Sequence, residues 1–179
     1  MINNDYLIDC SDWSDEGGYC QVYPIKNQSN LVFKEFKNKK KASEAHAIQK
    51  RLSKFDLAPK IYTDVCRLKF VYKDDVRFVD PSNWGFVTEL AKTYDPSTKI
   101  SMKDIQNLVN DIELKTGLKF WDCHWFNVGT VKRGRKNKVV CIDTGKESFN
   151  GISNAWGFAD PGPKCGYCSR YQCRCSSGV

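Results

Sequence analysis

The sequence predicts an α+β fold, in which an antiparallel sheet with one helix is followed by a shorter helical part. Residues 1–36 hold three runs of β-forming residues, separated by turn signals. Residues 41–55 repeat apolar residues at helical spacing, and so do residues 102–116. With 179 residues, 41% of them hydrophobic, the chain can bury one good core. The length leaves room for only a small appendage beyond that core.

Six segments are expected to form the sheet. Three of them precede the first helix, and three lie between that helix and residue 90. Loop signals rich in aspartate, asparagine and proline, at residues 74–75 and 80–83, lie between the last two segments. The six segments are residues 2–8, 20–25, 31–36, 61–65, 67–72 and 84–90.

The two helices are bounded by recognisable signals. The first helix is expected over residues 41–55, and Pro59 follows its end. The second is expected over residues 102–116, where the side chain of Ser101 can cap its start and Gly117 can end it. Asp104 stands in its first turn, as the helix dipole favours.

The remainder of the second half reads as a hairpin and loops. Residues 126–131 and 138–142 are expected to pair around a glycine-containing turn. After Gly145 the periodicity weakens, and loops are expected.

Three polar residues in this half have the spacing of a phosphoryl-transfer site. Asp122 stands five residues before Asn127, and Asp143 directly follows the apolar run 139–142. Phosphoryl transfer needs positioning and charge neutralisation more than covalent chemistry. One carboxylate can orient an acceptor hydroxyl, while an amide oxygen and a second carboxylate hold the metal that bridges the phosphates. We therefore expect Asp122 to orient the acceptor, and Asn127 and Asp143 to bind Mg²⁺.

This order of groups resembles the protein-kinase-like superfamily, and upstream motifs extend the resemblance. Residues 14–23 look like a degraded glycine-rich loop, with Gly17 at the middle glycine and Gly18 beside it. Val22 stands at the valine that would cover the adenine of ATP. Alternatively, the two glycines form a simple hairpin turn.

The resemblance also implies a lysine, a glutamate and a hinge. Residues 31–34 resemble the V-A-I-K motif, so that Lys34 would hold the α- and β-phosphates. Glu44 is similar to the helix glutamate that fixes this lysine, and Glu35 is the alternative. Residues 84–91 resemble the strand that leads into the hinge, with Thr88 at the gatekeeper position.

The hinge backbone from Glu89 to Ala91 would then contact adenine. The alternative to a phosphate-binding role is that Lys34 is a solvent-facing lysine on a strand.

The catalytic stretch departs from the H-R-D pattern of protein kinases. Phe120 and Trp121 stand where the histidine and arginine would be. The D-x-H-x-x-N pattern, with His124 two residues after the aspartate, is nearer the aminoglycoside-phosphotransferase and choline-kinase branch. His124 would either brace this loop or contact the substrate.

The resemblance divides the chain into three parts. Residues 1–91 correspond to the N-lobe and hinge, residues 92–160 to a reduced, helical C-lobe, and residues 161–179 to a cysteine-rich tail. The 34 residues after Gly145 are too few for a full helical C-lobe. A minimal, divergent member of this kind is typical of a phage-encoded protein that acts in the host cytoplasm.

The cysteine-rich tail is a separate candidate metal site. A CxxC pair is followed four residues later by a CxC pair, which places four thiols within eleven residues. Four thiolates suffice for a tetrahedral Zn²⁺, and two local disulfides or free thiols are the alternatives. The four residues are Cys165, Cys168, Cys173 and Cys175.

Charge and hydropathy limit the classes of partner that the protein can have. The net charge of +7 fits ATP and acidic partners and admits nucleic acid, but no aromatic residues interleave the basic runs 37–41 and 132–138. No stretch approaches the ~20 apolar residues of a membrane span, and no signal peptide is recognised. We therefore expect a cytoplasmic protein.

Taken together, the motifs predict an ATP- and Mg²⁺-dependent serine/threonine protein kinase. One rival is a pseudokinase that binds a host or partner protein without catalysis. The other is a zinc-bearing interaction module.

Overall fold

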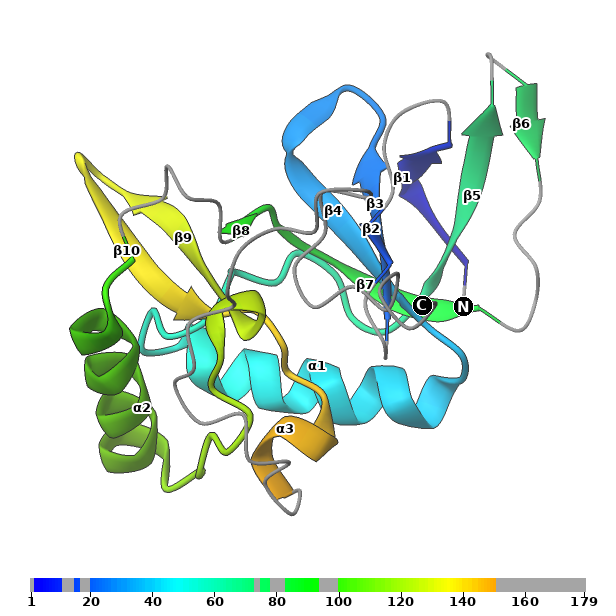
Figure 1. Ribbon diagram of the computed structural model, residues 1–179. Helices are drawn as coiled ribbons and strands as arrows, with labels where there is room; N and C mark the ends of the chain where they lie inside the picture. Colours follow the sequence, from blue (N-terminus) through cyan, green and yellow to red (C-terminus); the bar gives the residue numbers. More distant parts are fainter. Residues whose placement is uncertain are drawn as a thin grey trace, which may run out of the picture.

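The computed structural model describes residues 2–10, 15–16, 20–72, 75–77, 83–93 and 100–150 (Figure 1). The predicted α+β class is confirmed, with a large sheet and one helix followed by a smaller part built from helices and a second sheet. Gly17, Gly18 and the four tail cysteines lie outside the described residues, as does everything after residue 150. The predicted domain boundaries and the zinc site therefore stay predictions.

The first part is a seven-stranded sheet with the order β6-β5-β1-β3-β4-β7, and β2 pairs with β3. All its pairs are antiparallel except β1–β5, which is parallel. The expectation of a wholly antiparallel sheet was therefore wrong at this pair. The strands are β1 Ile2–Asp9, β2 Asp15–Glu16, β3 Gln21–Ile25, β4 Gln28–Phe36, β5 Arg67–Tyr72, β6 Asp75–Arg77 and β7 Trp84–Glu89.

The sheet curls until the segment before β5 meets β7. Cys66 and Gly85 exchange two backbone hydrogen bonds of 2.8 and 2.9 Å. The predicted strand 61–65 is absent, and Ile61 forms only an isolated bridge to β7. The Val87 N–H donates to the Thr63 side-chain oxygen (3.0 Å) instead of to a backbone carbonyl, which interrupts the ladder.

Alternate side chains of β4 pack inside the curled sheet or against α1, because successive side chains point to opposite faces of a strand. Phe33 packs inside the curled sheet in a cluster with Ile8, Leu68 and Val87. Phe36 packs on the other face against Ala42 of α1. Lys34 lies on the α1 side as well, since it is two residues from Phe36.

Helix α1, Lys39–Ser53, lies below the seven-stranded sheet (Figure 1). It begins two residues earlier than predicted because the Asn38 side chain caps it, accepting from the Lys41 N–H at 2.9 Å. It ends two residues early in a turn in which Asp56 takes a φ of +55°.

Helix α2, Met102–Thr116, has the bounds that the sequence predicts. Ser101 and Asp104 form a reciprocal capping box, and Gly117 ends the helix with a φ of +66°. No helix in the described part of the chain is long and apolar enough to cross a membrane.

A three-stranded sheet and two short elements complete the second part. The sheet has the order β10-β9-β8, and its β9–β10 pair is the predicted hairpin. The five-residue helix α3 was not predicted, because one turn is too short to show periodicity. The elements are β8 Lys92–Thr93, η1 Trp125–Asn127, β9 Val128–Arg133, β10 Lys136–Cys141 and α3 Lys146–Asn150.

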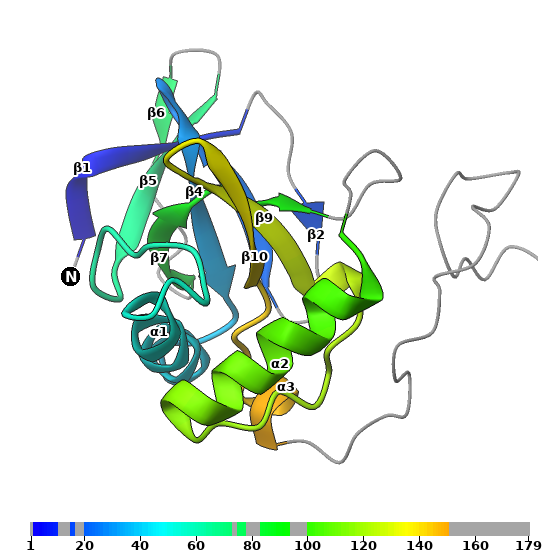
Figure 2. The same ribbon diagram turned by 90° about the vertical axis from the view of Figure 1, so that its left-hand side faces the viewer.

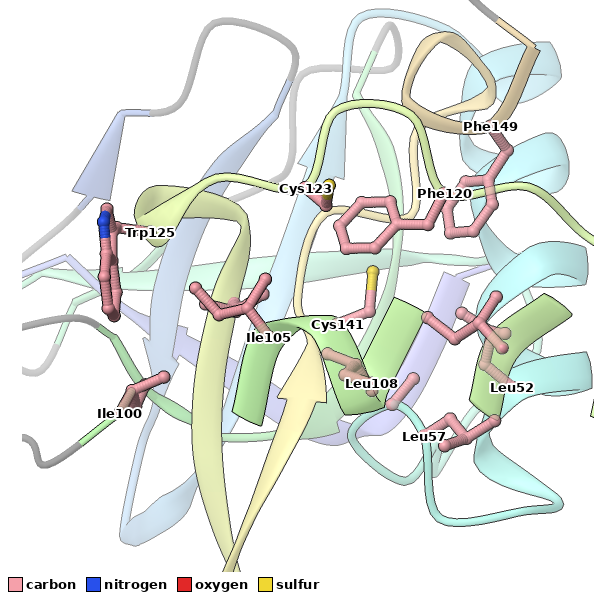
Figure 3. Close-up of a cluster of buried hydrophobic side chains, with 13 residues drawn as sticks. Leu52, Leu57, Ile100, Ile105, Leu108, Phe120, Cys123, Trp125, Cys141 and Phe149 are labelled. Atoms are coloured by element: carbon pink, nitrogen blue, oxygen red, sulfur yellow. The ribbon is translucent and has the colours of Figure 1, made fainter. Parts of the chain in front are cut away.

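One hydrophobic cluster joins α1, α2, β10 and the loop before η1 (Figure 3). In Figure 2, α2 lies beside α1 and below β10. Cys123 and Trp125, each 9% exposed, enter this cluster from the loop that carries Asp122. The rings of Phe120 and Phe149 stack with centroids 5.2 Å apart. The loop is therefore anchored by side chains on both sides of its polar residues.

We predict that Gly85→Ala unfolds the protein far more readily than Gly134→Ala. A Cβ on Gly85 would overlap the Lys34 carbonyl oxygen and the Phe33 ring, whereas no atom of the described residues lies within 4 Å of a Cβ on Gly134. The expected losses of unfolding free energy are about 3 kcal/mol at Gly85, from overpacking, and about 1 kcal/mol at Gly134, from its φ of +61°. Urea denaturation measures both, and equal losses would contradict the close packing of β7 on β4.

Candidate active site

The loop between Asp122 and Asn127 is held by its own side chains. Asn127 Nδ2 donates to the Asp122 carbonyl at 2.9 Å and to the Asp122 carboxylate at 3.0 Å. His124 Nδ1 accepts from the Phe126 N–H (3.2 Å), and His124 Nε2 lies 3.0 Å from Asn127 Nδ2. Nε2 lies 3.4 Å from Asp122 Oδ1. Of the two roles expected for His124, the geometry favours bracing Asp122.

Backbone hydrogen bonds place Asp143 beside Asn127. The Asn127 carbonyl accepts from the N–H groups of Ile142 (3.0 Å) and Asp143 (3.4 Å). The Asp143 carboxylate accepts from the Gly145 N–H (2.9 Å) and from Ser148 Oγ (2.8 Å). Each carboxylate oxygen is therefore oriented by one donor and keeps acceptor capacity for another partner.

Asn127 and Asp143 offer the donors that Mg²⁺ prefers. Asn127 is 9% exposed, and within the described part of the chain no group donates to its Oδ1. Mg²⁺ is commonly bound through one or two protein oxygens with phosphates and waters completing the shell. The residues therefore fit this ion. The described residues contain no cluster of three or more His, Cys, Asp or Glu side chains arranged for a metal.

Lys34 reaches this site from β4. It is 7% exposed, and its Nζ donates to the Ile142 carbonyl and to Gln49 Oε1 (3.3 Å). Ile142 directly precedes Asp143, so the ammonium lies next to the loop that carries the carboxylate. Val22 is paired opposite Lys34 and shares its face of the sheet.

The structure does not form the expected contact between Glu44 and Lys34. Glu44 pairs instead with Lys146, its Oε1 3.8 Å from Nζ. Each helical residue is rotated by about 100° from the last, so Glu44 stands beside the buried face that includes Ala45 and Gln49. Glu35, the alternative, lies next to Lys34 on the strand and therefore points to the opposite face.

The hinge residues lie between the two sheets. The Glu89 N–H donates to the Lys60 carbonyl (2.8 Å), while in the described structure no partner binds the Ala91 N–H. The Glu89 carboxylate accepts two hydrogen bonds from Arg133 of β9, at 2.7 and 3.0 Å. Arg133 also donates to Asp56 (2.7 Å), and these carboxylates raise the pKa of the Arg133 guanidinium.

The structure thus links all four residues predicted to be catalytic. Asp122 bonds to Asn127, Asn127 to the Asp143 backbone, and Lys34 to the carbonyl before Asp143. Three buried polar residues of the site were not predicted. A polar residue within the apolar stripe of α1 was the available signal for Gln49, but Thr144 and Ser148 had none. All three are under 2% exposed.

No protein-family model matches the chain, and no curated protein matches it in sequence. Among solved structures, its fold is similar to that of the Cydia pomonella granulovirus kinase PK-1, with a TM-score of 0.50 and 15% sequence identity. The match covers 79% of this chain and 54% of the viral protein, so this chain spans about half of that kinase. The likeness shows a protein-kinase-like fold.

We predict that Arg133→Met costs more stability than a matched change at the surface. Arg133 is 18% exposed and joins the hinge residue Glu89 to Asp56, whereas the Lys115–Asp111 pair is 37% and 44% exposed. Losing charged hydrogen bonds at a partly buried site should cost about 2 kcal/mol, and Lys115→Met less than about 0.5 kcal/mol. Thermal denaturation of both variants tests this, and equal shifts would contradict it.

Proposed function

We propose that this protein transfers the γ-phosphoryl group of ATP to a hydroxyl group, as a small serine/threonine protein kinase. The observation that carries the proposal is the continuous contact path through Asp122, Asn127, Asp143 and Lys34. Asp122 and Asn127 lie on the segment before β9, and Asp143 lies on the loop after β10. Lys34 comes from β4 of the seven-stranded sheet. Phosphoryl transfer needs this combination of two carboxylates, one amide oxygen and one cation.

ATP would lie between the two sheets. Val22 and the backbone from Glu89 to Ala91 would contact adenine, and the Ala91 N–H is available as a donor. Gly17 and Gly18 would cover the phosphates. Lys34 would align the α- and β-phosphates from its buried position.

Asp122 would act on the acceptor. In the reaction, the acceptor oxygen bonds to the γ-phosphorus, the bond from that phosphorus to the β–γ bridging oxygen breaks, and ADP leaves. The hydroxyl proton passes to the Asp122 carboxylate, which Asn127 and His124 hold in place. Mg²⁺, when held by Asn127 Oδ1 and Asp143, would neutralise phosphate charge.

Two exposed aromatic side chains support a protein acceptor. Trp121 is 49% exposed beside Asp122, and Phe126 is 38% exposed beside Asn127. Aromatic residues are enriched where protein surfaces bind each other. A peptide carrying the acceptor hydroxyl could cover both side chains while its serine or threonine meets Asp122.

We predict that Asp143→Asn abolishes phosphoryl transfer and leaves the fold intact. The amide keeps an oxygen that can accept from Gly145 but loses the charge needed for Mg²⁺. The rate of ³²P transfer from labelled ATP to acceptor proteins should fall more than about a hundredfold. Addition of EDTA to the wild type should have the same effect.

Asp111→Asn, at an exposed ion pair on α2, is the matched control and should retain full activity. Activity of Asp143→Asn within about tenfold of wild type would contradict the role of Asp143 as a Mg²⁺ ligand in phosphoryl transfer. ATP binding by the wild type without any transfer would instead favour a pseudokinase.

We predict that Lys34→Met impairs transfer more than nucleotide binding. The adenine contacts and the metal ligands survive the change, but the phosphates lose the cation that aligns them. Transfer should slow by about a hundredfold, equivalent to about 2.7 kcal/mol, with a much smaller change in calorimetric ATP affinity. Lys132→Met on β9 serves as the surface control. Equal losses of binding and transfer would make Lys34 a binding residue only.

A further inference from the structure

Gln49 is a completely buried amide at the centre of the site. It lies on α1 with 0% exposure and makes four hydrogen bonds. Its Oε1 accepts from Lys34 Nζ (3.3 Å) and from Thr144 Oγ1 (3.3 Å). Its Nε2 donates to the Pro59 carbonyl (3.0 Å) and to Thr88 Oγ1 (2.5 Å). A glutamine side chain has two donor hydrogens and two acceptor lone pairs, so its capacity is fully used.

The partners fix which way the amide points. An ammonium can only donate, and a proline carbonyl can only accept. Oε1 must therefore face Lys34, and Nε2 must face Pro59. Reversing the amide would set two donors against each other at one end and two acceptors at the other. The orientation of Gln49 is consequently determined by chemistry on both sides.

Gln49 also leaves the charge of Lys34 uncompensated. Within the described part of the chain, no carboxylate lies within ion-pair distance of Lys34 Nζ; its partners are the amide of Gln49 and the carbonyl of Ile142. A neutral acceptor orients the ammonium without forming an ion pair. The cation is therefore held in place with its charge available to an anion.

The same side chain touches the other parts of the site. Thr144 lies between Asp143 and Gly145, and it is 1% exposed. Thr88 is in β7 next to the hinge residue Glu89, and its hydroxyl donates to the Lys60 carbonyl at 2.8 Å. The Gln49 amide thus contacts Lys34, the threonine that follows Asp143, and Thr88 on the strand that leads to the hinge.

We infer that Gln49 is the positioning residue for Lys34, in place of Glu44, and that it ties Lys34 to the Asp143 loop and the hinge strand. Its catalytic consequence rests on the proposed phosphoryl transfer, whereas its effect on Lys34 does not. A side chain that only supported the fold would influence stability but would have no specific effect through Lys34.

The ordering of Lys34 can be measured directly in the protein without nucleotide. NMR detects a lysine ammonium group when hydrogen bonds slow the exchange of its protons with water. The wild type should show this signal for Lys34, identified by its loss in Lys34→Arg, with a contact to the Gln49 side chain. Absence of the signal or of the contact in the wild type overturns the inference without any Gln49 variant.

Three variants then separate positioning from stability. Gln49→Met has similar length but offers only a weakly accepting thioether sulfur, so it should lose the Lys34 signal. Gln49→Glu keeps an acceptor for Lys34 while losing the Nε2 donors, so it should retain the signal at reduced stability. Leu52→Ala, at another fully buried position of α1, should lower stability and retain the signal. A Lys34 signal unchanged in Gln49→Met would overturn the assignment.

Kinetics test the consequence for catalysis. Gln49→Met should lower kcat about tenfold with little change in the KM for ATP. In the Lys34→Met background, the same change should lower kcat less than about twofold, since residues that act through one another are not additive. An equal tenfold loss in both backgrounds would show a structural role only. Absence of transfer in the wild type would refute the proposed function, while the NMR result would still decide whether Gln49 orders Lys34.

Discussion

The site depends on the backbone hydrogen bonds that the Asn127 carbonyl accepts from Ile142 and Asp143. They join the loop carrying Asp122 to the loop carrying Asp143, which are separated in sequence by the β9–β10 hairpin. These bonds continue the β9–β10 ladder, whose last pair is Val128 and Cys141, and so hold the two carboxylate-bearing loops side by side. The buried side chains of Cys123 and Trp125 reinforce this junction by fixing the first loop in the hydrophobic cluster that joins α1, α2 and β10.

Helix α1 connects this junction to the large sheet. Its Ala42 and Ala45 pack against β4 and β7 in one hydrophobic cluster, while Leu52 packs in a second cluster with residues of α2 and β10. Gln49 stands between these two contacts and reaches Lys34. The helix therefore supplies packing to both parts of the molecule and a polar contact at the site between them. Because the Gln49 amide is buried, leaving it without hydrogen-bond partners would cost about 1–3 kcal/mol of folding free energy.

Elements specified by local signals could be predicted from the sequence. Helix α2 has its expected bounds because Ser101, Asp104 and Gly117 act within one turn of each end. The spacing of Asp122 and Asn127 likewise placed both on one loop. Features decided by distant partners could not be predicted. The parallel β1–β5 pair, the Thr63 hydroxyl that replaces a strand bond, and the choice of Gln49 over Glu44 arise from contacts between separate elements.

We propose that Lys34, Asn127 and Asp143 form one site for ATP and Mg²⁺. The most direct test is a crystal structure of the full chain with Mg²⁺ and a non-hydrolysable ATP analogue. We expect Mg²⁺ to be coordinated by Asn127 Oδ1 and the Asp143 carboxylate, and Lys34 Nζ to contact the α- and β-phosphates. Nucleotide bound elsewhere, or phosphates that contact neither Lys34 nor a metal at Asp143, would contradict it.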